Sequence, residues 1–336
     1  MDFVGKIVLV TGGTGSFGNY LVHRLLKSEV REIRIFSRDE KKQYDMRKNY
    51  GANPRLKFFI GDIRDANRLD EAMAGVDVAY QAAALKHVSV CEQAPFEAIK
   101  TNVMGVENVI RAALSHRINK LICLSTDKAV KPVNVMGMTK ALQERLIIAA
   151  NHSPSNHGTI CSVVRYGNVL LSRGSAIPFF RSQVARGEQI TITDEAMTRF
   201  LLTLGDAIEL VIFATDHSNG GETYVKKAPS VGIVQLARVL SEEKGRAFDY
   251  RVIGKLPGEK LHEILITEEE LERTVDRGEY FIIHPSWTTE RFQELTTEYA
   301  SNDELIDNDT DIKRLLQSAD ELAKSVNIED GAFSRI

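Results

Sequence analysis

The sequence is poor in cysteine and has no long apolar run. Its three cysteines, Cys91, Cys123 and Cys161, lie far apart, which argues against a disulfide framework and predicts reduced, buried thiols. No apolar stretch approaches the roughly 18 residues that a membrane-spanning helix needs. The N-terminal segment MDFVGKIVLVTGG lacks the plan of a signal peptide. We therefore expect a cytoplasmic protein with no membrane partner.

An excess of charge of one sign is also lacking. The chain carries 43 Lys and Arg residues against 46 Asp and Glu, a formal net charge of −3, so nothing draws it to nucleic acid. We expect neither a nucleic-acid partner nor a metal site. A chain of 336 residues can bury a sizeable core as one large domain, or as a main domain with a smaller lobe.

Short apolar runs alternate with helical patterns over the first half of the chain. Their near-continuous apolar character is typical of strands buried on both faces of a parallel sheet. The expected strands are residues 6–12, 32–37, 56–62, 76–84, 120–126 and 160–166. Apolar residues at helical spacing lie between them, as at Phe17, Leu21 and Leu25. This alternation predicts right-handed crossovers and a Rossmann-type, doubly wound α/β sheet.

The alternation loosens after residue 168. We expect a dinucleotide-binding domain over residues 1–168, with its core continuing in part through 205–217. Residues 169–336 would form a smaller α+β substrate-binding lobe and a C-terminal tail. Within this part, helical periodicity predicts helices over residues 230–245 and 311–326. The polar, acidic composition of residues 297–311 favours a solvated loop.

The segment TGGTGSFG follows the first expected strand and precedes a helix, the context in which a glycine motif indicates dinucleotide binding. Gly12 would allow the tight turn, Gly15 would let the backbone approach a pyrophosphate, and Gly18 would permit close packing of helix on strand. The phosphates would lie at the positive end of the helix.

The end of the second strand bears on the choice between NADP and NAD. Ser37 and Arg38 lie at its tip with Lys41 close behind, and arginine suits a 2′-phosphate. Asp39 lies late for a ribose contact, although a solvated charged turn is the alternative interpretation. We favour NADP over NAD. Asp62 and Ile63, after the third strand, would meet the adenine ring.

These segments, together with AAALKHV, LSTDKAVKPVNVMGMTK, RYGNVLLSRGSAIPFF, TITDEAMTRFLLTL and LPGEKLHE, resemble the extended short-chain dehydrogenase/reductases. The match runs from residue 3 to residue 285 and is most similar to the UDP-N-acetylglucosamine 4,6-dehydratase branch. The resemblance implies a tightly bound, recycled NADP and a UDP-sugar substrate. It adds further cofactor contacts: Ser16, Phe17, Ala82, Ala83, Ala84, Lys86, Lys140 and Tyr166.

The dehydratase assignment depends on Thr126, Asp127 and Lys128. In the reaction that the resemblance implies, hydride leaves C4 of the sugar, the C5 proton and the C6 hydroxyl are lost as water, and hydride returns to C6. It implies Asp127 as the acid at C6 and Lys128 as the base at C5. Lys128 would need a lowered pKa and Asp127 a raised one, or the two would share a proton. A surface ion pair in a turn is the alternative.

Met136 stands where most members of the family have a tyrosine, four residues before Lys140. A thioether has no acidic proton and cannot act as an acid or base. The C4 proton would therefore leave through Lys128, Lys140, or water relayed by Thr126 or Asp127. Because these other groups are retained, we expect a rewired active enzyme.

Around the substrate, the resemblance points to Lys86, His87, Asn168, Arg199 and Glu259. A solvated Lys86 and a salt bridge of Arg199 within the lobe are the alternatives. A UDP-hexose 4-epimerase and a catalytically silent NADP-binding module remain competing functions. Self-association as a dimer or larger oligomer is a further expectation from the family, while C5 retention or inversion and the glycan pathway stay open.

Overall fold

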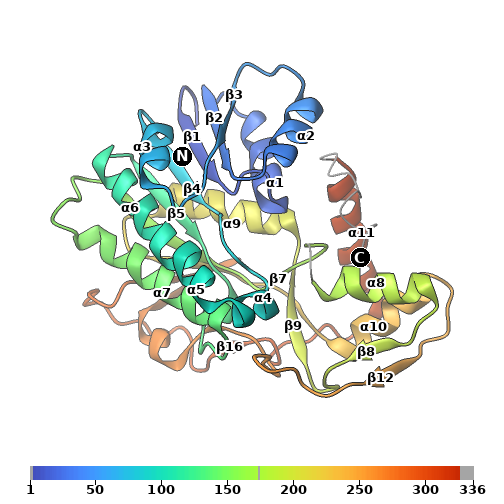
Figure 1. The fold of residues 1–336 in the computed structure, drawn as a ribbon. Coiled ribbons are helices and arrows are strands. Elements are labelled where there is room, and N and C mark those ends of the chain that lie inside the picture. Colours follow the sequence, from blue (N-terminus) through green and yellow to red (C-terminus); the bar gives the residue numbers. More distant parts are fainter. Residues whose placement is uncertain (1–2, 173–174, 326–336) are drawn as a thin grey trace.

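A nine-stranded sheet forms the centre of the molecule in the computed structural model, which describes residues 3–172 and 175–325 (Figure 1). The strand order is β14-β15-β10-β6-β5-β4-β1-β2-β3. The strands are β1 (Ile7–Thr11), β2 (Glu32–Ser37), β3 (Leu56–Ile60), β4 (Val78–Gln81), β5 (Lys120–Leu124), β6 (Ile160–Arg165), β10 (Thr223–Lys226), β14 (Thr274–Arg277) and β15 (Tyr280–Ile283). All pair in parallel except the β14–β15 hairpin, which adds antiparallel to β10.

Helices cover both faces of this sheet, which confirms the Rossmann-type, doubly wound fold (Figure 1). One face carries α1 (Ser16–Leu26), α2 (Glu40–Tyr50) and α9 (Leu204–His217), and the other carries α3 (Ala66–Met73), α6 (Gly105–Ser115) and α7 (Val135–Ala149). The side chains of β1 alternate between them: Val8 and Val10 enter the first core, and Ile7 and Leu9 enter the second.

A smaller lobe lies beside the carboxyl ends of the strands, with α8, α10 and α11 around its own core (Figure 1). It contains β7 (Asn168–Val169), α8 (Ala176–Arg186), β8 (Ile190–Ile192), β9 (Thr198–Leu202), β11 (Ser230–Gly232), α10 (Ile233–Glu242), β12 (Tyr250–Val252), β13 (Ile264–Ile266), β16 (Tyr299–Ala300) and α11 (Asp309–Ser325). The remaining short helices are α4 (Val88–Gln93), α5 (Pro95–Ala98), the π-helix η1 (Ile99–Met104), and the 3₁₀ helices η2 (Asp127–Ala129), η3 (Ala150–His152) and η4 (Glu268–Arg273).

The chain crosses the expected boundary at residue 168 more often than its sequence suggested. It leaves the sheet for the lobe, returns along α9 and then adds β10, β15 and β14 to the sheet. Strands β10 (TYVK) and β14 (TVDR) mix polar with apolar residues, so no continuous apolar run marks them. The segment 297–311 contains β16, and Tyr299 hydrogen-bonds the backbone of Ala228, so it is anchored. The tail expected up to residue 336 lies partly outside the described residues.

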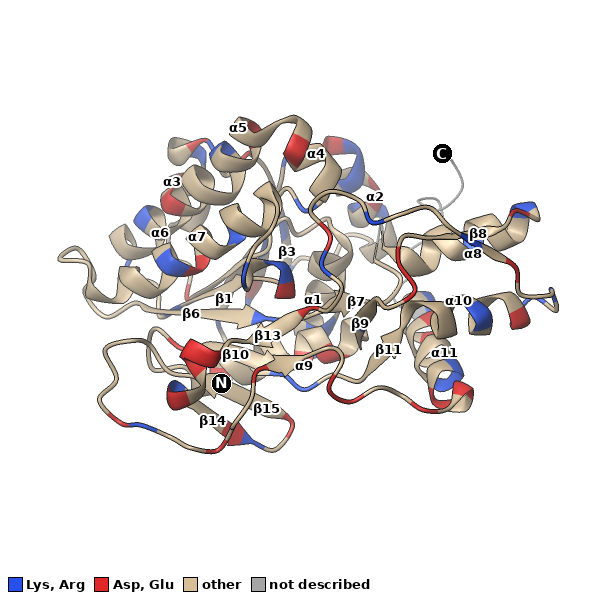
Figure 2. Ribbon diagram, turned by 90° about the horizontal axis from the view of Figure 1, so that it is seen from below, with Lys and Arg blue, Asp and Glu red and all other residues tan. Residues whose placement is uncertain are grey.

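Charge is distributed over the whole molecule. In the view of Figure 2, Lys and Arg alternate with Asp and Glu along the helices and loops, in keeping with a net charge near zero. Among the described residues, no helix combines the length and the apolar character needed to cross a membrane.

A buried arginine joins the sheet to both α7 and η4. The Arg165 guanidinium, on β6, donates to both carboxylate oxygens of Glu144 at 3.1 and 2.7 Å and to both of Glu270 at 2.9 and 3.0 Å. It also donates to the carbonyl of Leu265 at 2.8 Å. Burial opposes the charge, but the two carboxylates outweigh it and raise the pKa of Arg165.

Replacing Arg165 with Met should strongly destabilise the fold, because it leaves the buried carboxylate of Glu144 and the largely buried carboxylate of Glu270 without their cation. We expect a loss of about 3–5 kcal/mol in the free energy of unfolding, measured by urea denaturation. Arg24→Met removes an exposed pair with Glu209 and should cost at most about 1 kcal/mol. Equal losses in the two variants would contradict this account.

Candidate functional site

The loop after β5 places its side chains where the carboxyl ends of β5 and β6 lie side by side. Its backbone is tied to the end of β6, because Ser125 N donates to Val164 O at 2.7 Å and Asp127 N donates to Tyr166 O at 3.0 Å. The Thr126 side chain caps η2, which begins at Asp127. Ligands of doubly wound sheets bind at this edge.

Asp127 and Lys128 are in direct contact in this loop. The Nζ of Lys128 donates to Asp127 Oδ1 at 3.0 Å and to Asn168 Oδ1 at 3.1 Å, and it lies 3.1 Å from Glu263 Oε1. Thr126 Oγ1 donates to Asp127 Oδ1 at 2.8 Å. Asp127 is fully buried, and its Oδ2 has no hydrogen-bond partner among the described residues. The alternative of a solvated surface pair therefore does not describe this contact.

Two residues of the site, Lys260 and Glu263, were missed by our sequence analysis. Lys260 Nζ donates to Asp127 O at 3.2 Å and also to Val130 O, and it lies 3.6 Å from Glu263 Oε2. Arg199 Nε lies 3.9 Å from Glu263 Oε1. The signal that could have found them is the segment LPGEKLHE, in which the resemblance pointed only to Glu259.

The environment shifts the pKa of both members of the pair. Burial raises the pKa of Asp127, and nearby Glu263 adds to this against the opposing Lys128. Burial alone would lower the pKa of Lys128, but Asp127 and Glu263 outweigh it and the pKa is raised. The lowered pKa that Lys128 would need to act as a base is therefore not found in the free protein.

Met136 and Lys140 lie on α7 but face different surroundings. Met136 is buried in an apolar cluster with Cys91 and Ala98. Lys140 Nζ donates to Leu124 O at 2.6 Å and to Gln143 Oε1 at 2.9 Å, and burial lowers its pKa. Lys140 is thus held at the end of β5 by its own helix.

The glycine loop fits a dinucleotide. Gly12 has φ +65°, and a Cβ there would lie 2.9 Å from the backbone of Ala83. At Gly18 a Cβ would lie 2.5 Å from the backbone of Gly13, so α1 packs directly against the turn. Gly15 is the N-cap of α1 and has no side chain to accept hydrogen bonds from the first turn. The backbone N–H groups of this turn can therefore donate to a ligand.

The other residues predicted to bind the cofactor lie around this loop. Ser37 Oγ hydrogen-bonds Thr14 Oγ1 at 2.7 Å, and Arg38 Nη1 donates to Asp62 Oδ2 at 3.3 Å from a largely exposed position. Lys41 is exposed and pairs with Asp45 on α2, so it is turned toward its own helix. The remaining predicted contacts occupy α1 and the ends of β3, β4 and β6: Ser16, Phe17, Ile63, Ala82, Ala83, Ala84 and Tyr166.

The predicted substrate residues are only partly brought together. Asn168 contacts Lys128, and Arg199 lies against Glu263 and donates to Leu261 O at 3.0 Å. Glu259 instead accepts from Leu256 N in a turn of its own segment. Lys86 and His87 are exposed at the start of α4.

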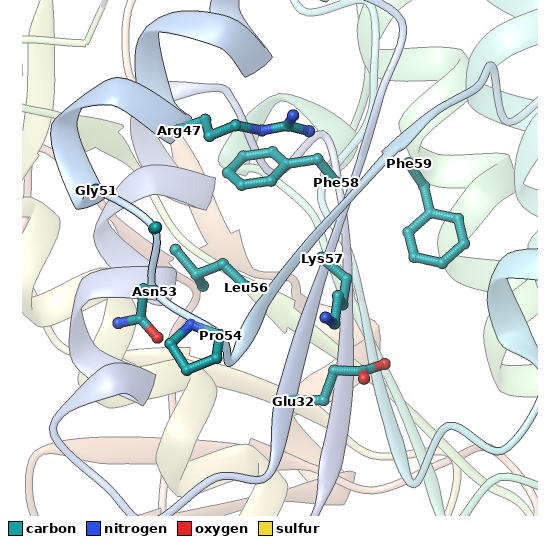
Figure 3. A pocket seen from close by; sticks show the side chains of 10 residues that line it. Glu32, Arg47, Gly51, Asn53, Pro54, Leu56, Lys57, Phe58 and Phe59 are labelled. Atoms are coloured by element: carbon teal, nitrogen blue, oxygen red, sulfur yellow. The ribbon is translucent and has the colours of Figure 1, made fainter.

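A hollow of about 590 Å³ at the free edge of the sheet is unrelated to this site. It is lined by β3, the end of α2 and Glu32 at the start of β2. In Figure 3, Arg47 lies over the ring of Phe58, and Lys57 and Phe59 belong to the same strand. It therefore adds no group to the chemistry at the carboxyl ends of the strands.

Comparison with known proteins gives a consistent set of similarities. The family model described as polysaccharide biosynthesis protein matches residues 8–285. A relative from Rickettsia prowazekii (strain Madrid E), named UDP-glucose 4-epimerase, is 45% identical, covering 96% of this chain and 99% of its own. Pen from Bacillus thuringiensis has a TM-score of 0.89 at 36% identity, covering 95% of this chain and 100% of its own. The dTDP-glucose 4,6-dehydratase of Streptomyces venezuelae, solved with NAD, is similar in fold, with a TM-score of 0.69 at 22% identity over 76% and 86% of the two chains.

Gly12→Ala should abolish tight binding of NADP and NAD, because its Cβ would meet the backbone of Ala83 and the turn would open. Gly5 makes a matched control, since it has φ +69° but no atom within 4 Å of the place that a Cβ would take. Gly5→Ala should cost only about 1–2 kcal/mol of stability through its backbone strain and leave the cofactor affinity intact. Fluorescence titration would measure both affinities, and unchanged binding in Gly12→Ala would refute this assignment.

Proposed function

The chain belongs to the family of polysaccharide biosynthesis proteins, and from this we propose that it is an NADP-dependent 4,6-dehydratase of UDP-N-acetylglucosamine. The product would be a UDP-4-keto-6-deoxy-N-acetylhexosamine. The fold is the one found in nucleotide-sugar dehydratases and epimerases. The observation that carries the choice of dehydration is the buried contact of Asp127 with Lys128 at the carboxyl ends of β5 and β6.

Dehydration needs an acid and a base at adjacent carbons, and this pair can supply both. With one proton shared, Asp127 can be a carboxylic acid while Lys128 is a neutral amine. Lys128 would take the C5 proton, and Asp127 would give its proton to the departing C6 hydroxyl, which leaves as water. The pair ends as carboxylate and ammonium, 3.0 Å apart. As hydride returns to C6, the Lys128 ammonium would give a proton back to C5, and the proton released from the C4 hydroxyl would restore Asp127 as an acid.

The raised pKa of Lys128 is compatible with this role once substrate fills the site. In the free protein Asp127 and Glu263 favour the ammonium of Lys128 and raise its pKa, whereas burial and Glu263 raise the pKa of Asp127 and disfavour its carboxylate. Exclusion of water by a bound sugar disfavours charged groups and would move the pair toward its neutral form. Bound NADP would supply the acceptor for hydride at C4 and its return at C6.

The cofactor and the C4 proton would depend on residues after β2, after β5 and on α7. Arg38 supports NADP, although its contact with Asp62 holds it only weakly at an exposed position. Lys140 would hold the nicotinamide ribose. Lys128, Lys140, and the hydrogen bond from Thr126 to Asp127 are the candidate routes for the C4 proton.

A UDP-hexose 4-epimerase is the second candidate, because relatives about half identical to this chain carry the name UDP-glucose 4-epimerase. Epimerisation reverses C4 and requires no proton exchange at C5 or C6. The buried Asp127–Lys128 pair has no necessary task in such a reaction, which is why we place dehydration first.

A proton NMR time course with UDP-N-acetylglucosamine in deuterated water tests the proposal. Dehydration would give a new C6 methyl signal with deuterium at C5, whereas an epimerase would convert UDP-glucose to UDP-galactose with no methyl signal. Asp127→Asn and Lys128→Met should each slow methyl formation by about 10²–10⁴-fold while keeping the fold. An unchanged spectrum with every UDP-sugar would favour a silent NADP-binding module.

Met136→Leu should retain dehydration within about threefold, because leucine is close in volume and methionine carries no proton for the reaction. Lys140→Met should in contrast lose most activity and weaken NADP binding. Methyl formation by NMR, together with cofactor titration, would measure both. A large loss in Met136→Leu would mean that the thioether itself contacts the reacting sugar.

A further inference from the structure

Glu263 is a buried carboxylate that faces cations from three separate parts of the chain. Only 2% of its surface is exposed. Lys128 Nζ approaches at 3.1 Å, Lys260 Nζ at 3.6 Å and Arg199 Nε at 3.9 Å. Its backbone is fixed by two hydrogen bonds to Ser301, which links it to β16. Glu263 is therefore placed rigidly at the point where the lobe meets the catalytic loop.

The Lys260 side chain hydrogen-bonds the backbone of the same loop. Its Nζ donates to the carbonyls of Asp127 and Val130, which lie at the two ends of η2. The neighbouring Gly258 carbonyl accepts from Asn134 Nδ2 at 2.8 Å, and Asn134 is the N-cap of α7. One short segment of the lobe thus holds both the acid–base loop and the start of the helix that follows.

We propose that Glu263 and Lys260 are positioning residues that fix the place and the protonation of the Lys128 ammonium before substrate binds. The proposal rests on the function proposed above, in which Lys128 exchanges a proton with Asp127. Glu263 is not itself assigned a contact with the sugar. Its carboxylate attracts the Lys128 ammonium, which hydrogen-bonds both Asp127 and Asn168. The hydrogen bonds of Lys260 to the loop backbone hold the loop in this position.

The charges around Lys128 predict in which direction each substitution should change how tightly Lys128 holds its proton. The groups that face it are Asp127, Asn168, Glu263 and, through Glu263, Arg199 and Lys260. Removing the Glu263 charge would leave three cations with one carboxylate, so the Lys128 proton would be held less tightly. Removing Lys260 would have the opposite effect, because Glu263 would then be shared by two cations, Lys128 and Arg199, instead of three. If these ion pairs were purely structural, the two substitutions would change stability but would not shift the protonation of Lys128 in opposite directions.

Competitive acylation of lysines in the NADP-loaded protein, read peptide by peptide by mass spectrometry over a neutral-to-alkaline pH series, tests the inference. The midpoint at which Lys128 becomes reactive should fall by about one pH unit or more in Glu263→Gln and rise in Lys260→Gln. Exposed Lys131, which pairs with Glu298, serves as the internal reference. Glu272→Gln removes an exposed carboxylate of the same half of the chain and should leave the Lys128 midpoint unchanged.

An unchanged Lys128 midpoint in Glu263→Gln would overturn the inference. Should that variant not fold, Lys260→Gln decides, and a fallen or unchanged midpoint there would overturn it. This labelling needs no sugar, so it separates the inference from the proposed reaction. If the wild-type protein gives no C6 methyl signal by NMR, dehydration is refuted whatever the labelling shows. If Glu263→Gln shifts the Lys128 midpoint and also shifts the alkaline side of the pH profile of dehydration, both the inference and the proposed reaction are supported.

Discussion

One ammonium held between two carboxylates organises the candidate site. Lys128 contacts Asp127 beside it in sequence and Glu263 from the small lobe, and neither carboxylate is exposed. Buried charges are costly unless they are paired, so moving the loop away from the lobe would leave buried carboxylates without their cation. The sheet edge, the lobe and the acid–base chemistry therefore depend on the same contact.

Contacts at α7 and at the loop before it join the two parts of the chain. Arg165 fixes the helix to β6 and η4 through Glu144 and Glu270, and Lys260 fixes the loop before it. Because α7 carries both Met136 and Lys140, its position sets where the retained lysine lies. The buried methionine packs on α4 and contributes no polar group, which leaves proton transfer to the loop after β5.

The sequence predicted the first six strands and the glycine turn because their signals are local: continuous apolar runs, and glycine between strand and helix. It also placed Asp127 and Lys128 in one site, since they are adjacent after a strand. Strands β10 and β14 mix polar with apolar residues and gave no such signal. Glu263 and Lys260 could not be found in this way, because their contacts arise only when the lobe folds back on the loop.

The free edge of the sheet has its own consequence for the protein in solution. Strand β3 has no neighbour on one side among the described residues, and Ile60 is half exposed there. Exposed Lys57 lies along the same strand and Arg47 covers Phe58 at 4.9 Å. Another strand pairing at this edge would have to strip water from both cations and displace the guanidinium from the ring. The charged side chains thus make pairing of another strand at this edge unfavourable and oppose aggregation through the sheet.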